Sequence, residues 1–301
     1  MLDYALLSAL SAVAALGSFE KAAQMLHVTP SAVSQRIKLL EERMGQVLII
    51  RGQPCRPTEA GALLCAHADQ VLLLEDELRG KLPLAPLWTD TGHDWPKIKV
   101  GVNADSVATW LVSTVAEFAA ERRVLVDFVV DDQDYTAPLL RAGTVIGAIT
   151  TADTPIQGCR VQALGRMRYR GVASPAYVQR YLPHGPVGAD LAGAPCLTFN
   201  QKDMLQADFL LRLAGEPLAP PSHWLPDSNG FIAACLGGMA WGMVPEMMIL
   251  DELMRGDLVD IAPGQYSDVM LYWQCPRLGL PLLEALTAAI VAGGRKYLIG
   301  D

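Results

Sequence analysis

Short polar side chains recur at helical spacing in the segment 30–44. Ser31, Ser34 and Gln35 can donate and accept hydrogen bonds, and Lys38 adds a cation at the rim of the same face. The opposite face is apolar at positions i, i+4, i+7 and i+11 and is expected to pack on a core: Val33, Ile37, Leu40 and Met44. Such a helix fits the major groove of duplex DNA. Helix pairs in enzymes show the same spacing, so spacing alone leaves both interpretations open.

Capping residues on either side predict how this helix is held. Ser18 is a good N-cap for a short helix over Phe19–Leu26, and a tight turn follows. Thr29 is placed to cap the next helix, with Pro30 at its first position, where a missing N–H costs nothing. Gly45 is expected to end it. The pattern predicts a helix-turn-helix.

A small hairpin is expected to follow as a wing. Val47–Ile50 and a turn at Gly52–Cys55 would place Arg51 and Arg56 against the DNA backbone. The net charge of the whole chain is -8, which argues against a nucleic-acid ligand, but five of the six basic residues in the first sixty lie at 36–56, against two acidic ones. This local charge is suited to phosphates, although a solvated surface would also explain it.

The segment after Thr58 is predicted to be one long helix. Positions 60, 64, 67, 71, 74 and 78 alternate steps of four and three, which is the coiled-coil period, and His67 is the polar member. His67 could lie in a dimer seam or be partly exposed. Pairing of this helix with a second copy would set two recognition helices about 34 Å apart, or a multiple of that. Packing on its own chain is the alternative.

From residue 97 onward, short β-rich runs alternate with helical stretches. The expected strands are Ile98–Val102, Val124–Val130, Val145–Ile149, Tyr169–Ala173, Cys196–Phe199 and Trp241–Val244. The expected helices of the first set are Val107–Glu121 and Ala137–Gly143. This alternation predicts a parallel sheet covered by helices, followed by a second lobe of similar build. The apolar run Phe231–Leu250 is predicted to be a buried helix, turn and strand.

Polar residues follow several of these strands, where open α/β sheets bind ligands. Asp105 or Ser106 is expected to cap the helix at Val107, whose free N–H groups would suit the carboxylate of an amino acid. The acidic run 131–134 could bind a cationic group or be a solvated turn. The predicted ligand-binding set is Asn103, Asp105, Ser106, Asp132, Thr150, Phe199, Asn200 and Asp227, with the second-lobe members facing the first lobe across a cleft.

No motif for catalysis, metal or cofactor binding is visible in the sequence. The five histidines are scattered, and the six cysteines have neither metal-ligand nor redox spacing. We therefore expect no enzyme activity, no cofactor and reduced thiols. Neither Ala5–Ala15 nor Phe231–Leu250 has the flanks of a signal or membrane segment, so a cytoplasmic location is expected.

The N-terminal pattern closely resembles that of LysR-type transcriptional regulators over residues 5–65, and the whole chain agrees in length and layout. The matching residues are Gly17–Phe19, Ala22–Ala23, Leu26, Val28–Ser34, Ile37, Leu40–Glu41, Gly45, Leu48, Arg51, Pro57–Thr58 and Ala60–Gly61. The resemblance implies that Ser31, Ser34 and Gln35 face the major groove and that Lys38 and Arg51 approach phosphates. The predicted DNA-binding set also includes Thr29, Arg36 and Arg56. The wing departs from the common pattern at Ile49–Ile50 and Pro57.

Further matches resemble the branch of this family that senses lysine and arginine and controls basic amino-acid export. They are Val102–Ser106, Ala108–Trp110, Arg36–Lys38, Arg56–Thr58 and Leu271–Trp273. The resemblance implies L-lysine or L-arginine as effector, activation of an exporter gene, and a homodimer or homotetramer on double-stranded DNA. Asp105 and Asp132 are the expected partners of the effector side chain, with Asp203 in reserve. Another small-molecule effector, or a nucleoid-type DNA binder with weak ligand response, remains the alternative.

Together these patterns predict an α/β chain with a winged helix-turn-helix, a long linker helix and a two-lobed effector domain like that of periplasmic binding proteins. The expected boundaries are 1–58 for the DNA-binding domain and 59–82 for the dimerising linker helix. Residues 97–165, completed by 269–301, would form lobe I, and residues 166–268 would form lobe II.

Overall fold

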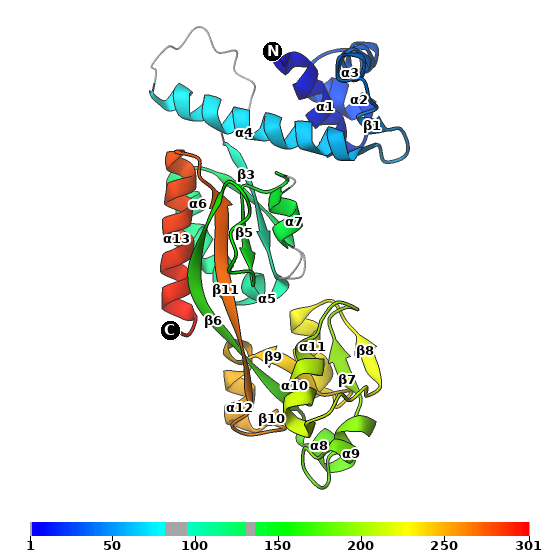
Figure 1. Ribbon diagram of the computed structural model, residues 1–301, viewed down its shortest axis with the longest axis vertical. Coiled ribbons are helices and arrows are strands. Elements are labelled where there is room, and N and C mark those ends of the chain that lie inside the picture. The colour runs from blue at the N-terminus through cyan, green and yellow to red at the C-terminus, as the bar shows by residue number, and fades with distance from the viewer. Residues whose placement is uncertain (1, 82–94, 131–135, 142, 301) are drawn as a thin grey trace.

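The computed structural model describes residues 2–81, 95–130, 136–141 and 143–300. An N-terminal helical unit lies at one end of the molecule, and a long helix joins it to two lobes stacked one below the other (Figure 1). The N-terminal unit consists of α1 (Tyr4–Leu16), α2 (Phe19–Met25), α3 (Pro30–Met44), β1 (Ile49–Ile50) and β2 (Arg56–Pro57).

Side-chain caps fix the helix-turn-helix as the sequence predicts. The hydroxyl of Ser18 accepts a 3.3 Å hydrogen bond from the backbone N–H of Lys21 at the start of α2. Thr29 caps α3 in the same way, and Gly45 ends α3 in the left-handed conformation at φ 69°. One detail of the predicted apolar stripe is wrong. Met44 is 37% exposed, because it lies in the last turn of α3, beyond the core that buries Val33, Ile37 and Leu40.

The linker helix α4 (Glu59–Lys81) contacts both halves of the molecule. Its first turn approaches the wing so closely that a Cβ on Gly61 would lie 2.1 Å from the carbonyl oxygen of Leu48. Further along, Asp69 pairs with Lys99 of the first lobe at 2.7 Å, and Leu73 packs against the core of that lobe. His67 is exposed.

The effector domain is built on a mixed sheet, which differs from the predicted parallel one. In the described residues it has seven strands in the order β10-β6-β11-β5-β3-β4, and β9 also pairs with β6. Their bounds are β3 Lys97–Val102, β4 Leu125–Val130, β5 Gly147–Thr150, β6 Cys159–Ala173, β9 Gly242–Pro245, β10 Val259–Asp260 and β11 Tyr266–Pro276. The predicted parallel part is confirmed for β3, which is parallel to β4 and β5.

The antiparallel part arises because the chain crosses between the lobes on two long neighbouring strands. β6 carries the chain from the first lobe to the second, and β11 returns alongside it (Figure 1). The predicted strand Tyr169–Ala173 is therefore the far end of β6. The apolar run Phe231–Leu250 does contain the predicted helix end, turn and strand.

Helices cover each lobe. Around the first lobe lie α5 (Ala104–Ser106), η1 (Val107–Leu111), α6 (Val112–Arg122), α7 (Thr136–Arg141) and α13 (Pro281–Tyr297). The second lobe contains α8 (Pro175–Tyr181), α9 (Gly188–Gly193), β7 (Cys196–Thr198), α10 (Leu205–Ala214), β8 (Ser222–Trp224), α11 (Ser228–Leu236), η2 (Glu246–Met248) and α12 (Leu250–Arg255). Trp110, Trp241 and Trp273 are fully buried in the main core.

Candidate functional site

The outer face of α3 presents the predicted DNA-binding side chains. Ser31, Gln35 and Lys38 are exposed and Ser34 is half-buried. The apolar stripe on the other side is buried from Val33 to Leu40. The hydroxyl of Thr29 accepts a 3.2 Å bond from Ala32 N–H and also lies 2.9 Å from the hydroxyl of Ser31. The first turn of the helix is thereby fixed beside the residues that would reach base edges.

The basic side chains of the N-terminal unit make only weak contacts within the described structure. Lys38 lies 3.8 Å from Glu42, and both side chains are more than half exposed, so this pair contributes little stability. The Arg51 guanidinium lies 5.2 Å from the ring centre of Phe19, which steadies it beside α2. Arg56 is exposed on β2, and Arg36 is half-buried on α3. Lys38, Arg51 and Arg56 are therefore exposed, and no buried ion pair among the described residues holds them away from a phosphate.

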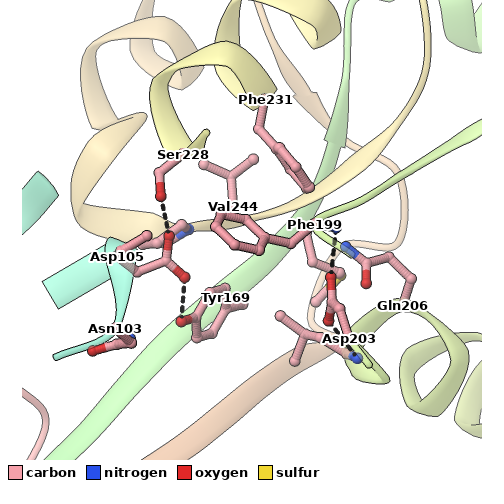
Figure 2. Close-up of a pocket in the computed structure, with 13 residues that line it drawn as sticks. Asn103, Asp105, Tyr169, Phe199, Asp203, Gln206, Ser228, Phe231 and Val244 are labelled. Atoms are coloured by element: carbon pink, nitrogen blue, oxygen red, sulfur yellow. Dashed lines mark hydrogen bonds between the residues drawn. The ribbon is translucent and has the colours of Figure 1, made fainter. Parts of the chain in front are cut away.

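A second site lies between the two lobes. A pocket of about 560 Å³, including its mouth, is lined by Asn103, Ala104, Asp105, Tyr169, Phe199, Asp203, Leu205, Gln206, Ser228, Phe231, Met243, Val244 and Pro245. Figure 2 shows Asp105 and Asp203 on opposite sides of it, with Phe199 between them. Among the described lining residues there are two carboxylates and no Lys, Arg or His. Such a lining is suited to a ligand that carries positive charge.

Asp105 holds one side of the pocket. Its carboxylate accepts a 2.6 Å hydrogen bond from the hydroxyl of Ser228 and a 2.7 Å bond from the hydroxyl of Tyr169 (Figure 2). The prediction that Asp105 or Ser106 caps a helix at Val107 is wrong. The helix begins earlier, at Ala104, so both residues lie inside its first turn and Asn103 takes the cap position.

Asp203 holds the other side. Its two carboxylate oxygens accept 3.0 Å bonds from the backbone N–H groups of Phe199 and Leu205. These bonds fix the loop between β7 and α10 and place the charge of Asp203 at the pocket wall. Gln206 and Phe231 complete this side with a buried amide and an aromatic ring.

Four of the other predicted ligand-binding residues, all within the described part of the chain, do not line the pocket. Ser106 is fully buried, and the Thr150 hydroxyl bonds to the backbone of Ala152. The Asn200 side chain accepts a bond from Lys202 N–H, and Asp227 caps α11. Asp132 lies outside the described residues.

Sequence reasoning missed several residues that the fold brings to the pocket. Tyr169, Gln206, Ser228 and Phe231 all line it. One of them could have been found from the sequence. Gln206 is a polar residue on the apolar face of α10, three and four residues before the buried Phe209 and Leu210. The other three come from strand and helix positions whose orientation depends on long-range pairing.

Other kinds of site are not evident in the described part of the chain. It contains no group of three His, Cys, Asp or Glu residues that could hold a metal ion. All six cysteines are free, and burial raises the pKa of the Cys235 thiol to about 12 and also that of Cys196. None of the described helices has both the length and the apolar character needed to cross a membrane.

Comparisons with known proteins match both parts of the chain. Residues 4–62 match the bacterial regulatory helix-turn-helix protein, lysR family, and residues 92–295 match the LysR substrate binding domain. The chain is 45% identical over 299 residues to the HTH-type transcriptional regulator ArgP of Pseudomonas aeruginosa, covering 99% of this chain and 98% of that protein.

Two solved structures are similar over the full length. The crystal structure of ArgP from Mycobacterium tuberculosis matches with a TM-score of 0.82 and 42% identity, covering 100% of both chains. Full-length LysG from Corynebacterium glutamicum with bound effector Arg matches with a TM-score of 0.70 and 32% identity, covering 99% of this chain and 100% of that one. On its domain matches and these relatives, the chain belongs to the LysR family of bacterial transcriptional regulators.

Proposed function

We propose that this regulator binds arginine or lysine between its lobes and, in response, activates transcription of a basic amino-acid exporter gene. The observation that carries the proposal is the pair of carboxylates on opposite sides of the pocket, Asp105 and Asp203, in a lining without a basic side chain among its described residues. A basic amino acid carries two cationic groups and one carboxylate. The two acidic positions match the two cations.

Specific contacts follow from the lining. Asp105 would bind one cation of the effector, and Asp203 would attract the other beside the rings of Phe199 and Phe231, which can stack on a guanidinium. Asn103 contributes an amide next to Asp105 for the effector carboxylate. The effector Arg present in the Corynebacterium glutamicum LysG structure supports this assignment.

On the DNA side, Ser31, Ser34 and Gln35 would read base edges in the major groove. Thr29, Arg36, Lys38, Arg51 and Arg56 would contact the phosphate backbone or border it. Dimerisation through α4 would present two such helices together. Its exposed leucines support pairing, because Leu63, Leu74 and Leu78 share one face of the helix and are each between 45% and 50% exposed.

Binding can shift the regulator only through different affinities for two arrangements of the lobes. We infer that ligand-dependent closure reorients protomers within a dimer or tetramer and changes the spacing of the winged units on DNA. A role as regulator rather than enzyme is supported by the family assignment.

Two measurements on the full-length protein test this function. Calorimetric titration should show saturable binding of arginine or lysine and none of norleucine, which lacks the side-chain cation. A gel shift on DNA upstream of a neighbouring transporter gene should change on adding the same ligand. Absence of binding by any basic amino acid would refute the effector, and ligand binding without any change in footprint or transcription would refute the coupling.

A further inference from the structure

A buried amide in the pocket wall has an acceptor that nothing in the described structure satisfies. Gln206 is 4% exposed, and its side-chain oxygen Oε1 has no hydrogen-bond partner among the described residues. A buried acceptor without a donor destabilises a protein, so such an atom in a native structure calls for a donor from a ligand, an ion or water. The position of Gln206 in the lining of the pocket indicates a ligand as the missing donor.

The surroundings of Gln206 define what that donor must be. Figure 2 shows its amide turned from α10 toward Phe199 and Asp203. The Asp203 carboxylate contributes negative charge there, and its two backbone bonds keep it in place. Phe199 and Phe231 contribute ring faces. The amide oxygen, the carboxylate and the two aromatic rings together suit a planar cation that carries several N–H donors.

We propose that Gln206 is a specificity-determining residue that favours arginine over lysine, an inference that rests on the proposed function. A guanidinium has five N–H donors and, once buried, needs a second acceptor besides the Asp203 carboxylate. Gln206 Oε1 provides it. The ammonium of lysine has three donors and is compact, so Asp203 satisfies a larger share of them and less depends on Gln206.

The test is titration of the full-length protein with arginine, lysine and norleucine, comparing wild type with Gln206→Met. Methionine keeps the length and volume of the side chain but lacks the acceptor. We expect the Kd for arginine to rise at least about tenfold and that for lysine about threefold or less, because the lost bond is charge-assisted. Gln206→Glu restores an acceptor and adds charge, so it should bind both cations at least as tightly as wild type.

The matched control is Gln274→Met. Gln274 is also fully buried, but its amide is satisfied by the backbone of Ile156, Ala152 and Thr154, away from the pocket. This control should lower the melting temperature and leave the ratio of arginine to lysine affinity unchanged.

Three results would overturn the inference or its basis, and they differ from one another. Unchanged arginine affinity in Gln206→Met would show that Oε1 is not used. Equal losses for arginine and lysine would show that Gln206 does not discriminate between them. Failure of wild type to bind any basic amino acid would refute the proposed function itself. If Gln206→Met does not fold, Gln206→Glu carries the test, and weaker arginine binding in that variant would overturn the inference.

Discussion

The carboxylate of Asp105 accepts a 2.6 Å hydrogen bond from the hydroxyl of Ser228, a residue 123 positions later in the chain. Asp105 lies on α5 of the first lobe, and Ser228 begins α11 in the second (Figure 1). The 2.7 Å bond from Tyr169 on β6 adds one of the strands that join the lobes. A cation that binds Asp105 would share or replace these bonds, so we expect ligand binding and the arrangement of the lobes to be coupled at this one group.

Ser228→Ala should therefore weaken effector binding as well as stability. We expect a loss of about 1 kcal/mol in the free energy of unfolding, as for a typical hydrogen bond, and a several-fold rise in effector Kd. The control is Ser174→Ala, which removes the hydroxyl that accepts a 3.4 Å bond from Tyr177 N–H at the start of α8, outside the pocket. Denaturant unfolding and calorimetry check both variants. Equal Kd values in the two would contradict a role for Ser228 in closure.

Local signals are sufficient to predict the helix-turn-helix. Ser18, Thr29 and Gly45 act on backbone groups within a few residues, and the structure places them at the predicted caps. The mixed sheet is not predictable in this way, since it depends on β11 pairing with β6 about a hundred residues earlier. The periodicity of helices and strands does not reveal that β11 returns beside β6.

In the candidate ligand site, too, some features follow from local sequence and others depend on long-range contacts. Asn103 follows a recognisable buried strand and lines the pocket. Asp105 also lines it, as its residue type suggests, but its expected capping role is wrong because the helix begins earlier, at Ala104. Its hydrogen-bond partners, Tyr169 and Ser228, are distant in sequence and could not be read from the local pattern. Ser106 and Thr150 face other parts of the structure although they also follow strands. Sequence can thus indicate which strand ends matter but not which side chains converge.

A glycine in β5 makes room for a core tryptophan. A Cβ on Gly147 would lie 2.2 Å from Cη2 of Trp273, whose buried indole N–H donates a 3.1 Å bond to Thr287. Because the ring is fixed, Gly147→Ala should cost about 1–3 kcal/mol of unfolding free energy. Gly193→Ala is the control, since a Cβ at that position would have no other group within 4 Å among the described residues. Thermal unfolding should separate them, and a similar melting temperature for both would contradict this packing.

The ion pair between Arg168 and Asp268 should make stability depend on pH. Two 2.8 Å bonds from the Arg168 guanidinium hold the pKa of Asp268 below its usual value. The unfolded carboxyl, with a pKa of about 3.9, binds protons more readily, so this pair stabilises the fold above that pH and its contribution is lost as pH falls through the folded pKa.

Asp268→Asn should therefore lower stability at pH 7 and flatten the dependence of unfolding free energy on pH in the acidic range. Asp257→Asn breaks a more exposed pair with Arg255 and should change stability little. Urea unfolding at several pH values measures both, and an unchanged acid slope in Asp268→Asn would count against the assignment.

The proposed base contacts predict different losses on different DNAs. Ser34→Ala combined with Gln35→Ala should weaken binding to the specific site by about 1–3 kcal/mol per lost base contact and leave binding to unrelated DNA nearly unchanged. Lys38→Ala should weaken both and lower the salt slope by about one, since it removes a phosphate contact.

Glu42→Gln is the matched control, because it removes the acidic neighbour 3.8 Å from Lys38 without touching the polar face of α3. It should leave DNA affinity unchanged or slightly higher. Gel shifts over a range of salt concentrations distinguish these cases. Equal losses on all DNAs from the Ser34 and Gln35 double variant would show that this face of α3 does not read sequence.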